Sequence, residues 1–598
     1  DLSKVTDIGK RAFAGCISLQ SIGNLPKVTT IGEWTFAGCA ALKSVGNMPN
    51  VTSIANGAFA GYTLYDDDGQ KIRTDYCTSL QSIGSMPKLE TIGDNAFSRC
   101  SSLTSVGDLG NVTNIGSYAF GDCIVLKSIG NLPKVTSIGE YAFAGCAALK
   151  SVGNMPNLTS IGERAFADYS LYDDDGQLIR TDYCTSLQSV GDMPKLEVVS
   201  DCAFYNCASL TKMGALTNVK TIERWAFGAC ASLKSISNMP KLETIGEYAF
   251  YNCSSLANID ALKTVTSIGE YAFTKCTSLA SIDNLNNVAS IGADAFAGCT
   301  ALKKIADLPS VTNIGDWVFA GCTQLVSVGN MPNLTSVGQG IFSGLTYNDD
   351  NGQAIRTEYC VSLQSVGNMP KLASGGRVMF YKCSALKSVG NLSSLTVIPD
   401  SMFEGASSLT SLGDLSSVTS ISKRAFHSCS SLKRLNNLSS LRTIGERAFC
   451  NCSALVNVSS LSGVTSIGDS AFYGCRSLTS LGSLSSIISI DQWAFANCTS
   501  LESVGNMNYL TSLGNRAFQG CTSLISVGNM PKLTQIGENA FANCSALASV
   551  GSLSSVTSIG DHAFLSCGSL KTIGSMSKVQ TIGMGAFASC KSLVSITS

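Results

Sequence analysis

The sequence predicts a solenoid, a fold in which the chain winds through many short, similar rungs stacked on one another. The spacing of phenylalanine leads to this prediction. The chain has 24 Phe residues, and each lies 23 residues from the next except at three steps of 38 residues. A period of 20 to 29 residues with apolar residues at fixed offsets is typical of a leucine-rich-repeat solenoid. Because each rung buries its apolar side only against its neighbours, we expect residues 1–598 to form a single continuous solenoid of about 24 rungs, elongated and curved or superhelical.

The second observation is the pattern inside one rung, numbered from its cysteine as in residues 146–168, CAALKSVGNMPNLTSIGERAFAD. Apolar residues fall at positions 1, 4, 7, 10, 13, 16, 20 and 21, which is the period of neither a helix nor a strand alone. We expect short parallel strands around positions 4 to 7 and 13 to 16. We also expect a helical turn in the GExAF segment, because Glu at position 18 suits a helix N-terminus.

The third observation is position 9, which is Asn or Asp in most rungs, as in Asn24, Asn47, Asp108, Asn131 and Asn154. Proline follows two residues later in many rungs. A stacked Asn column can bond backbone groups where the coil turns. We therefore interpret this column as structural rather than catalytic.

The run from Cys through SL, IG and AF back to Cys at 23 residues resembles the BspA-like (Treponema pallidum type) leucine-rich repeats, and the resemblance covers the whole chain. The family usually reads TIP after the first strand, where this chain reads GNMP or GNLP. The resemblance implies a surface protein of anaerobic bacteria or mucosal protozoa, located extracellularly or at the cell surface. It also implies adhesion to host matrix proteins, epithelial surfaces or other bacteria.

The 25 Cys residues follow the same frame, because position 1 takes all of them except Cys202 and Cys450. Free Cys behaves as a small buried hydrophobe, so we expect a reduced, buried column rather than disulfides. No CxxC pair occurs and the chain has only two His, so we predict no metal and no cofactor. Cys202 lies at the variable position 19, where exposure would make it a candidate reactive thiol.

Position 19 varies most and holds all four Trp residues of the chain. A stripe rich in Trp, Tyr and Arg has the composition of binding hot spots, and flat rings can also stack on sugars. The alternative is that these long side chains simply lie over the turn below and shield it. The candidate binding residues are Trp34, Tyr118, Tyr141, Trp225, Tyr248, Tyr271, Trp317, Trp493, Arg424 and Arg447.

Three inserts, residues 62–76, 169–183 and 345–359, account for the three long steps. Each carries an Asp-Gly or Asn-Gly pair between strand-forming residues, which predicts a protruding β-hairpin. We expect the hairpin arginines to pair with acidic residues opposite. A loose calcium site at the acidic tips is an alternative to a solvated turn, although the EF-hand template fails. The candidate residues are Asp66, Asp67, Asp68, Arg73, Asp173, Asp174, Asp175, Arg180, Asp349, Asp350 and Arg356.

Composition narrows the function classes. Charged residues make up 14% and the net charge is −1, which predicts no nucleic-acid partner. No apolar run approaches a membrane span of about 20 residues. The chain begins and ends inside a rung, which we interpret as an excerpt of a longer secreted or anchored protein, or as a polymerising unit.

No catalytic set of nucleophile, base and metal can be nominated, so we predict that the chain is not an enzyme. The leading hypothesis is a cell-surface interaction or adhesion protein that binds proteins or glycans through many weak contacts. The alternative is a structural stalk, surface layer or filament subunit that associates end to end.

Overall fold

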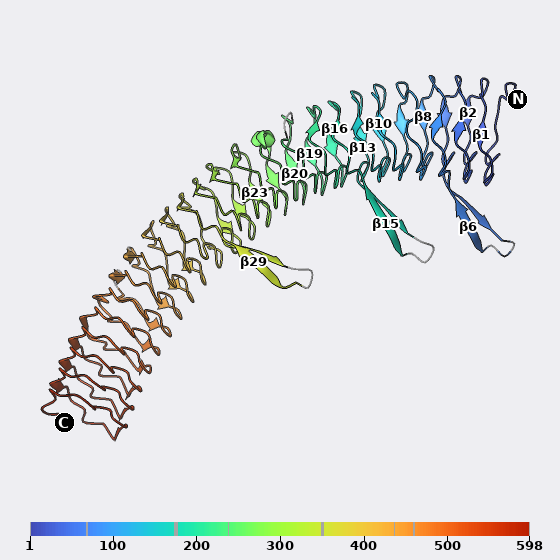
Figure 1. Cartoon of the computed structure of the whole chain (residues 1–598). Coiled ribbons are helices and arrows are strands. Elements are labelled where there is room, and N and C mark those ends of the chain that lie inside the picture. Colours follow the sequence, from blue (N-terminus) through green and yellow to red (C-terminus); the bar gives the residue numbers. More distant parts are fainter. Residues whose placement is uncertain are drawn as a thin grey trace. The chain divides into compact units, whose positions relative to one another are not determined.

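The computed structural model describes residues 2–66, 68, 70–172, 177–236, 239–348, 352–435, 437–458 and 461–596. The chain divides into two compact units, Asp1–Val288 (unit 1) and Ala289–Ser598 (unit 2), which share one rung architecture. The predicted leucine-rich-repeat solenoid with about 24 rungs and parallel strands is confirmed (Figure 1). That the rungs form one continuous body stays a prediction.

Most rungs contribute two-residue strands at positions 6–7 and 15–16, shorter than the sequence pattern predicts, and a few have only an isolated bridge there. A strand pairs in parallel with the equivalent residues of the next rung, as Ser21 does with Ser44. The register survives an insert, because Ser44 pairs with Ser82 across 38 residues. The second residue of each pair is usually buried and the first usually faces outward, as expected when successive side chains point to opposite faces of a strand.

The strands of unit 1 fall into these two sets. At positions 6–7 they are β1 (Ser21–Ile22), β3 (Ser44–Val45), β7 (Ser82–Ile83), β10 (Ser128–Ile129), β12 (Ser151–Val152), β16 (Ser189–Val190), β18 (Lys212–Met213) and β22 (Ser281–Ile282). At positions 15–16 they are β2 (Thr30–Ile31), β4 (Ser53–Ile54), β8 (Thr91–Ile92), β9 (Asn114–Ile115), β11 (Ser137–Ile138), β13 (Ser160–Ile161), β17 (Val198–Val199), β19 (Thr221–Ile222), β20 (Thr244–Ile245) and β21 (Ser267–Ile268). Neighbours follow the orders β1-β3-β7, β10-β12-β16-β18, β2-β4-β8-β9-β11-β13 and β17-β19-β20-β21.

The strands of unit 2 repeat the pattern. At positions 6–7 they are β24 (Lys304–Ile305), β26 (Ser327–Val328), β30 (Ser365–Val366), β31 (Ser388–Val389), β33 (Ser411–Leu412), β35 (Arg434–Leu435), β37 (Asn457–Val458), β40 (Ser503–Val504), β42 (Ser526–Val527), β44 (Ser549–Val550) and β46 (Thr572–Ile573). At positions 15–16 they are β23 (Ser290–Ile291), β25 (Asn313–Ile314), β27 (Ser336–Val337), β32 (Val397–Ile398), β34 (Ser420–Ile421), β36 (Thr443–Ile444), β38 (Ser466–Ile467), β39 (Ser489–Ile490), β41 (Ser512–Leu513), β43 (Gln535–Ile536), β45 (Ser558–Ile559) and β47 (Thr581–Ile582). In both units the strands stack in chain order, without crossovers.

The core is a set of columns that run along each unit. The Phe rings at position 21 stack nearly parallel, with centroids 5.2 Å apart for Phe36 and Phe59 and for Phe403 and Phe426. Leu at positions 4, 10 and 13 and Ile or Val at positions 7 and 16 fill the remaining space, and most are fully buried. Because each ring covers the next, the interior of every rung depends on its two neighbours.

The cysteine column is reduced, and most of its thiols are buried. Most thiols of the column donate to the carbonyl of the Phe 26 residues earlier, as Cys39 Sγ does to Phe13 O at 3.1 Å. Burial raises the pKa of Cys39 to about 12, so the thiol stays protonated and unreactive at neutral pH. Cysteine at position 1 is therefore a small apolar residue with one useful donor.

The Asn column at position 9 forms a side-chain ladder, as expected. The side chain of Asn24 accepts the backbone N–H of Asn47 at 2.8 Å, and Asn47 accepts that of Ser85 at 3.0 Å. Asn131 and Asn154 repeat the contact at 3.0 Å. These Asn side chains thus satisfy a backbone donor of the following rung at the corner where the coil turns, whereas Asn391 and Asp108 accept a backbone N–H of their own rung.

The helical turn predicted for the GExAF segment is wrong, because the segment forms successive non-helical turns. The N–H of Tyr141 donates to Glu163 O at 2.9 Å and that of Phe143 to Ala165 O at 2.7 Å, both in the next rung. Position 19 has a left-handed backbone in every rung. A left-handed residue interrupts a right-handed helix. Glu at position 18 therefore does not begin a helix.

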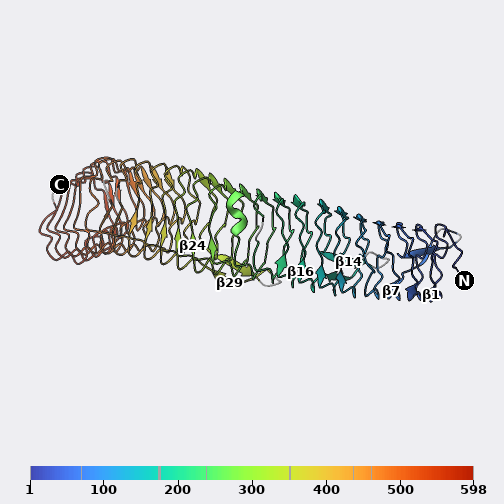
Figure 2. The same cartoon turned by 90° about the horizontal axis from the view of Figure 1, so that it is seen from above.

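Among the described residues the only helix is η1 (Asp260–Thr264), a short 3-10 helix that stands out as a coil in Figure 2. It replaces the usual corner after position 7 in its rung. No helix of the described residues is long and apolar enough to cross a membrane.

The three inserts form antiparallel strand pairs. They are β5 (Tyr62–Tyr65) with β6 (Lys71–Asp75), β14 (Asp168–Tyr172) with β15 (Leu178–Tyr183), and β28 (Leu345–Asn348) with β29 (Ala354–Glu358). Each has an irregularity in register at the equivalent place. The two hairpins of unit 1 leave the same edge of the rungs (Figure 1).

Candidate functional site

Position 19 combines an unfavourable backbone with large side chains. Its φ lies between 50° for Val378 and 63° for Gly57 across all 24 rungs. The left-handed conformation costs most residues about 1–2 kcal/mol, whereas Gly has no such cost and Asn or Asp have less. Most rungs nevertheless place Trp, Tyr, Arg or another ordinary residue there. We call these side chains the position-19 column.

Position 23 is the natural control, because it is left-handed in every rung except the three that precede an insert. There the chain mostly uses Gly, Asn or Asp, such as Gly145, Asn206 and Asp122. The same backbone demand is therefore met mostly by Gly, Asn or Asp at position 23, where Arg99, Lys275 and Lys382 are among the exceptions, and mostly by other residues at position 19. Local backbone preference does not explain the residues of the position-19 column.

In unit 1 the aromatic members of the column stack on one another. The Trp225 and Tyr248 rings are 4.3 Å apart with an interplanar angle of 4°, and the Tyr248 and Tyr271 rings are 4.6 Å apart. We call Trp225, Tyr248 and Tyr271 the aromatic ladder. Tyr205 and Tyr251, at position 22, meet Trp225 edge-on at 5.4 and 5.3 Å.

A second stack joins Tyr118 to Tyr141 at 4.7 Å, and the Arg164 guanidinium covers Tyr141 at 5.7 Å. These rings are half-buried, and burial raises the pKa of Tyr118 and of Tyr141. Where rings stack in this way, their inner faces are already occupied. They offer edges and hydroxyl groups to a partner, and the stacking of sugars on ring faces is limited to the ends of a stack.

Two tryptophans lie over glycine. A Cβ added to Gly57 would come within 2.6 Å of the Trp34 ring, and one added to Gly340 would collide with the Trp317 ring. Both glycines occupy position 19 of the next rung. Here the indole shields the turn below it, as the alternative interpretation of the column expects.

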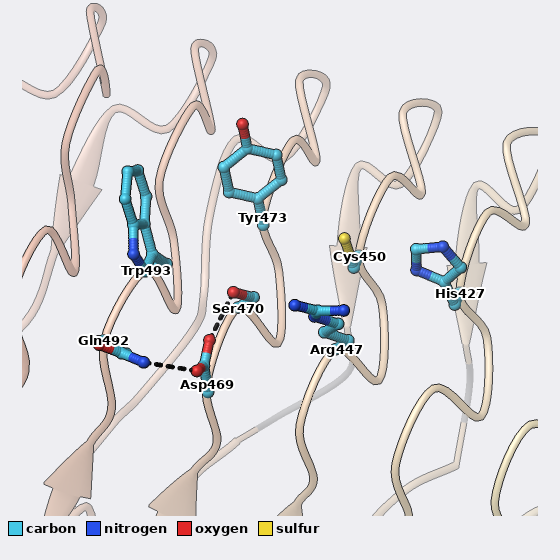
Figure 3. Close-up of a pocket in the computed structure, with 8 residues that line it drawn as sticks. All are labelled: His427, Arg447, Cys450, Asp469, Ser470, Tyr473, Gln492 and Trp493. Atoms are coloured by element: carbon cyan, nitrogen blue, oxygen red, sulfur yellow. Dashed lines mark hydrogen bonds between the residues drawn. The ribbon is translucent and has the colours of Figure 1, made fainter.

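In unit 2 the column contains Arg424, Arg447 and Trp493. Arg424 faces Glu404 at 3.9 Å and Arg447 faces Glu446 at 3.9 Å. The Arg516 guanidinium covers the Trp493 ring at 4.9 Å. Between Arg447 and Trp493 the column is interrupted by Ser470, and a cavity of about 400 Å³ lies there (Figure 3).

The hairpin of β14 and β15 is fastened to the rungs by the candidate residue Arg180 and by Asp122, which the sequence did not single out. Arg180 donates to both oxygens of Asp122, at 2.9 and 3.0 Å, and the Asp122 side chain is only 3% exposed. Burial raises the pKa of Asp122 although Arg180 opposes the shift. Arg99 contacts Tyr76 at the base of the first hairpin and Tyr169 in the second.

In the described part of the chain the hairpin arginines pair with acidic residues of their own strand, and their pairing with the acidic residues opposite, most of which lie outside that part, stays a prediction. Arg73 pairs with Asp75 at 2.8 Å, Arg180 with Asp182 at 2.5 Å and Arg356 with Glu358 at 3.2 Å, each two residues along the same strand. In a strand, residues i and i+2 share one face, which makes this contact shorter than a reach to the tip.

The acidic tips are only partly described. Asp66 accepts the backbone N–H groups of Asp68 at 3.1 Å and of Gln70 at 2.7 Å, so its side chain closes the loop. The described residues contain no group of His, Cys, Asp and Glu arranged to hold a metal. The candidate residues Asp67, Asp173, Asp174, Asp175, Asp349 and Asp350 lie outside the described residues.

Cys202 is buried, with 8% exposure, and burial raises its pKa to about 11. The expectation of an exposed, reactive thiol at this position is therefore wrong. Half-buried long side chains on the adjoining rungs, Arg164 and Trp225, flank it in the position-19 column.

A family model described as the BspA type leucine rich repeat region matches six copies, over residues 2–67, 74–173, 182–262, 243–349, 358–456 and 465–594. A leucine-rich repeat protein from Bacteroides ovatus is 23% identical, with 77% of this chain and 92% of that chain covered and a TM-score of 0.41. A leucine rich cell surface protein from Faecalibacterium prausnitzii is 19% identical (82% and 93% covered, TM-score 0.24). The leucine rich repeat protein of T. pallidum is 20% identical (42% and 88% covered, TM-score 0.23). No curated protein sequence matches the chain.

Proposed function

The chain belongs to the BspA-type leucine-rich repeat family, and from that premise we propose that it is a non-enzymatic interaction protein of the cell surface. It binds host matrix or cell-surface proteins, or their glycans, through the position-19 column. Leucine-rich repeat proteins bind other proteins, and the solenoid presents the same edge of every rung along each unit.

The observation that supports this proposal is the contrast between positions 19 and 23. Strained backbone positions persist where the surrounding structure or a function requires them. Position 23 mostly relieves the strain with Gly, Asn or Asp, whereas more than half of the position-19 residues are Trp, Tyr or Arg, which are enriched in binding hot spots. A partner that contacts several rungs gains by effective concentration, so weak contacts at each rung suffice.

The test removes the aromatic ladder and measures adhesion. The triple variant Trp225→Ser, Tyr248→Ser, Tyr271→Ser is compared with the full wild-type chain for binding to a surface coated with mixed extracellular-matrix proteins. We expect the apparent affinity of the variant to fall at least about tenfold, because hot-spot residues carry most of a binding free energy. Far-ultraviolet circular dichroism confirms that both proteins are folded.

The matched control substitutes Lys220, Glu243 and Thr266 with Ser, because these exposed residues lie at position 14 of the same three rungs. It should bind as the wild type does. Equal loss in both triple variants, or no loss in the ladder variant, contradicts the proposal. Fibres in electron micrographs of the purified chain would favour the alternative structural role through end-to-end association.

A further inference from the structure

The interruption at Ser470 leaves a space of one ring in the position-19 column. Figure 3 shows Ser470 between Arg447 of the preceding rung and Trp493 of the following rung. The Phe rings that mark these three rungs are 5.0 and 5.2 Å apart, so Arg447 and Trp493 are two rung steps from each other. We call the space bounded by Arg447, Ser470, Tyr473 and Trp493 the Ser470 slot.

The aromatic ladder shows what such a space holds when it is filled. Tyr248 occupies the middle rung there, with its ring 4.3 Å from Trp225 and 4.6 Å from Tyr271. Ser470 has the same backbone, with φ of 55° against 56° for Tyr248. The Ser470 slot thus has the ladder backbone with Arg447 on one side, Trp493 on the other and no ring between them, and the cavity of about 400 Å³ can accept a ring from outside.

One wall of the slot is a flat ring held in place. Arg516 covers Trp493 from the following rung at 4.9 Å, which leaves the other face of the indole turned toward Ser470. Tyr473 stands edge-on to Trp493 at 6.1 Å and closes one side (Figure 3). A ligand ring can therefore lie flat on Trp493 without displacing a protein side chain.

The base of the slot carries ordered polar groups. Asp469 accepts hydrogen bonds from Gln492 Nε2 at 2.7 Å and from Ser470 Oγ at 2.5 Å, which fixes the carboxylate and leaves further lone pairs toward the cavity. Arg447 lies on the opposite wall and is 44% exposed. His427 lines the far end, and its buried Nδ1 has no hydrogen-bond partner within the described part of the chain.

We propose that the Ser470 slot binds one pyranose ring of a neutral saccharide. The apolar face of the sugar stacks on Trp493, and its hydroxyl groups bond Asp469, Gln492 and Arg447. An aromatic side chain would fill the same space, but it would leave these donors and acceptors at its edge without partners, which is costly. An anionic sugar would gain from Arg447 and be repelled by Asp469. The inference rests on the proposed function of the column, since it names the ligand of one segment.

The test is saturation-transfer NMR with the full-length chain and three probes: methyl β-galactopyranoside, methyl β-glucopyranoside and p-cresol, which mimics a tyrosine side chain. We expect saturation of the ring protons of at least one glycoside, with a dissociation constant on the order of 1 mM for a ligand of this size. Transfer to p-cresol alone would overturn the proposal in favour of an aromatic peptide. No transfer to either glycoside would also overturn it.

The decisive variant is Ser470→Tyr, which fills the slot from within. Tyr occupies position 19 in four other rungs, so the variant should fold. We expect glycoside binding to fall more than about tenfold. The control Ser401→Tyr changes the same residue type in the same column, but neither neighbour of Ser401 in the column, Val378 or Arg424, carries a ring. It should bind as the wild type does.

Trp493→Leu, which removes the platform, should also abolish binding. Glycoside binding that survives both Ser470→Tyr and Trp493→Leu would contradict the assignment. Loss of matrix binding in the ladder variant, with no loss in Ser470→Tyr, would support the proposed function even if no glycoside binds. Failure of the saccharide proposal can therefore be told apart from failure of the proposed function.

Discussion

The aromatic ladder in unit 1 and the Ser470 slot in unit 2 share the left-handed backbone at position 19, but the ladder has three rings in consecutive rungs where the slot has Arg447, Ser470 and Trp493. In the ladder, Tyr248 fills the space between its neighbours, and the column is a closed stack. In the slot, Ser470 leaves that space open between Arg447 and Trp493. A single side chain at position 19 therefore decides whether the edge of the rungs is a shielded stack or a cavity with a free ring face.

A third state of the column, an indole over glycine, gives the largest expected effect. Gly340→Ala adds a Cβ that collides with the Trp317 ring at a left-handed backbone position. We expect a loss of about 2–4 kcal/mol in the free energy of unfolding, since overpacking and left-handed strain add. Chemical denaturation measures it. The control Gly352→Ala has a φ of 76° and no atom within 4 Å of the added Cβ, so a similar loss there would show that backbone strain alone is responsible.

Removing the central ring of the aromatic ladder should have the next largest effect on stability. Tyr248→Ser removes two stacked contacts, each worth about 0.5–1.5 kcal/mol, and should lower the unfolding free energy by about 2 kcal/mol. The measurement is again denaturation, with Thr266→Ser, on the exposed side of the Tyr271 rung, as control. A loss below about 0.5 kcal/mol in Tyr248→Ser would mean that the stack is not stabilising.

Filling the Ser470 slot with a ring should raise the free energy of unfolding instead of lowering it. Ser470→Tyr adds a ring beside Trp493 without changing the backbone conformation, so we expect a gain of about 1 kcal/mol in unfolding free energy. Thermal unfolding of this variant beside Ser401→Tyr separates the effect of the adjoining indole from that of a tyrosine at position 19. Equal changes in the two variants would show that Trp493 does not stabilise a neighbouring ring as the rings of the aromatic ladder stabilise one another.

The smallest expected effect is a pH dependence of the free energy of unfolding, which arises from His427. Burial lowers the pKa of His427, partly opposed by Glu404. The unfolded chain then binds this proton more tightly than the folded chain, so stability is fully present above about pH 6.5 and falls as the pH drops toward the folded-state pKa. His427→Gln should lose less stability between pH 7.5 and 5.5 than the wild type loses. A larger loss in the variant would contradict this sign.

Much of the fold could be predicted because the similar rungs of one sequence can be compared with one another. Twenty-four Phe residues in one frame predict the stacked rings, and the Asn24 to Asn47 ladder follows from the same frame. The turn segment could not be predicted. GERAF suits a helix start, but the hydrogen bonds run to the next rung and position 19 is left-handed, which depends on the stack and not on local preference.

The sequence predicts which position of the rung forms the candidate site, but it does not predict which side chains contact one another there. Variable residues at position 19 predict a stripe, yet whether Trp225 stacks on Tyr248 or Trp34 lies over Gly57 depends on the residue in the next rung. The Ser470 slot was visible in the sequence as a small residue between Arg447 and Trp493. The hairpin contacts were not visible, because Asp122 and Arg180 are 58 residues apart.

A crystal structure of the Ser470→Tyr variant shows whether the space between Arg447 and Trp493 accepts a ring as the aromatic ladder does. We expect the introduced ring to stack nearly parallel to Trp493, with centroids about 4.5–5 Å apart as offset-stacked aromatic pairs prefer, and the cavity to be filled. An introduced ring that points into solvent, with the cavity still open beside Trp493, would contradict this expectation.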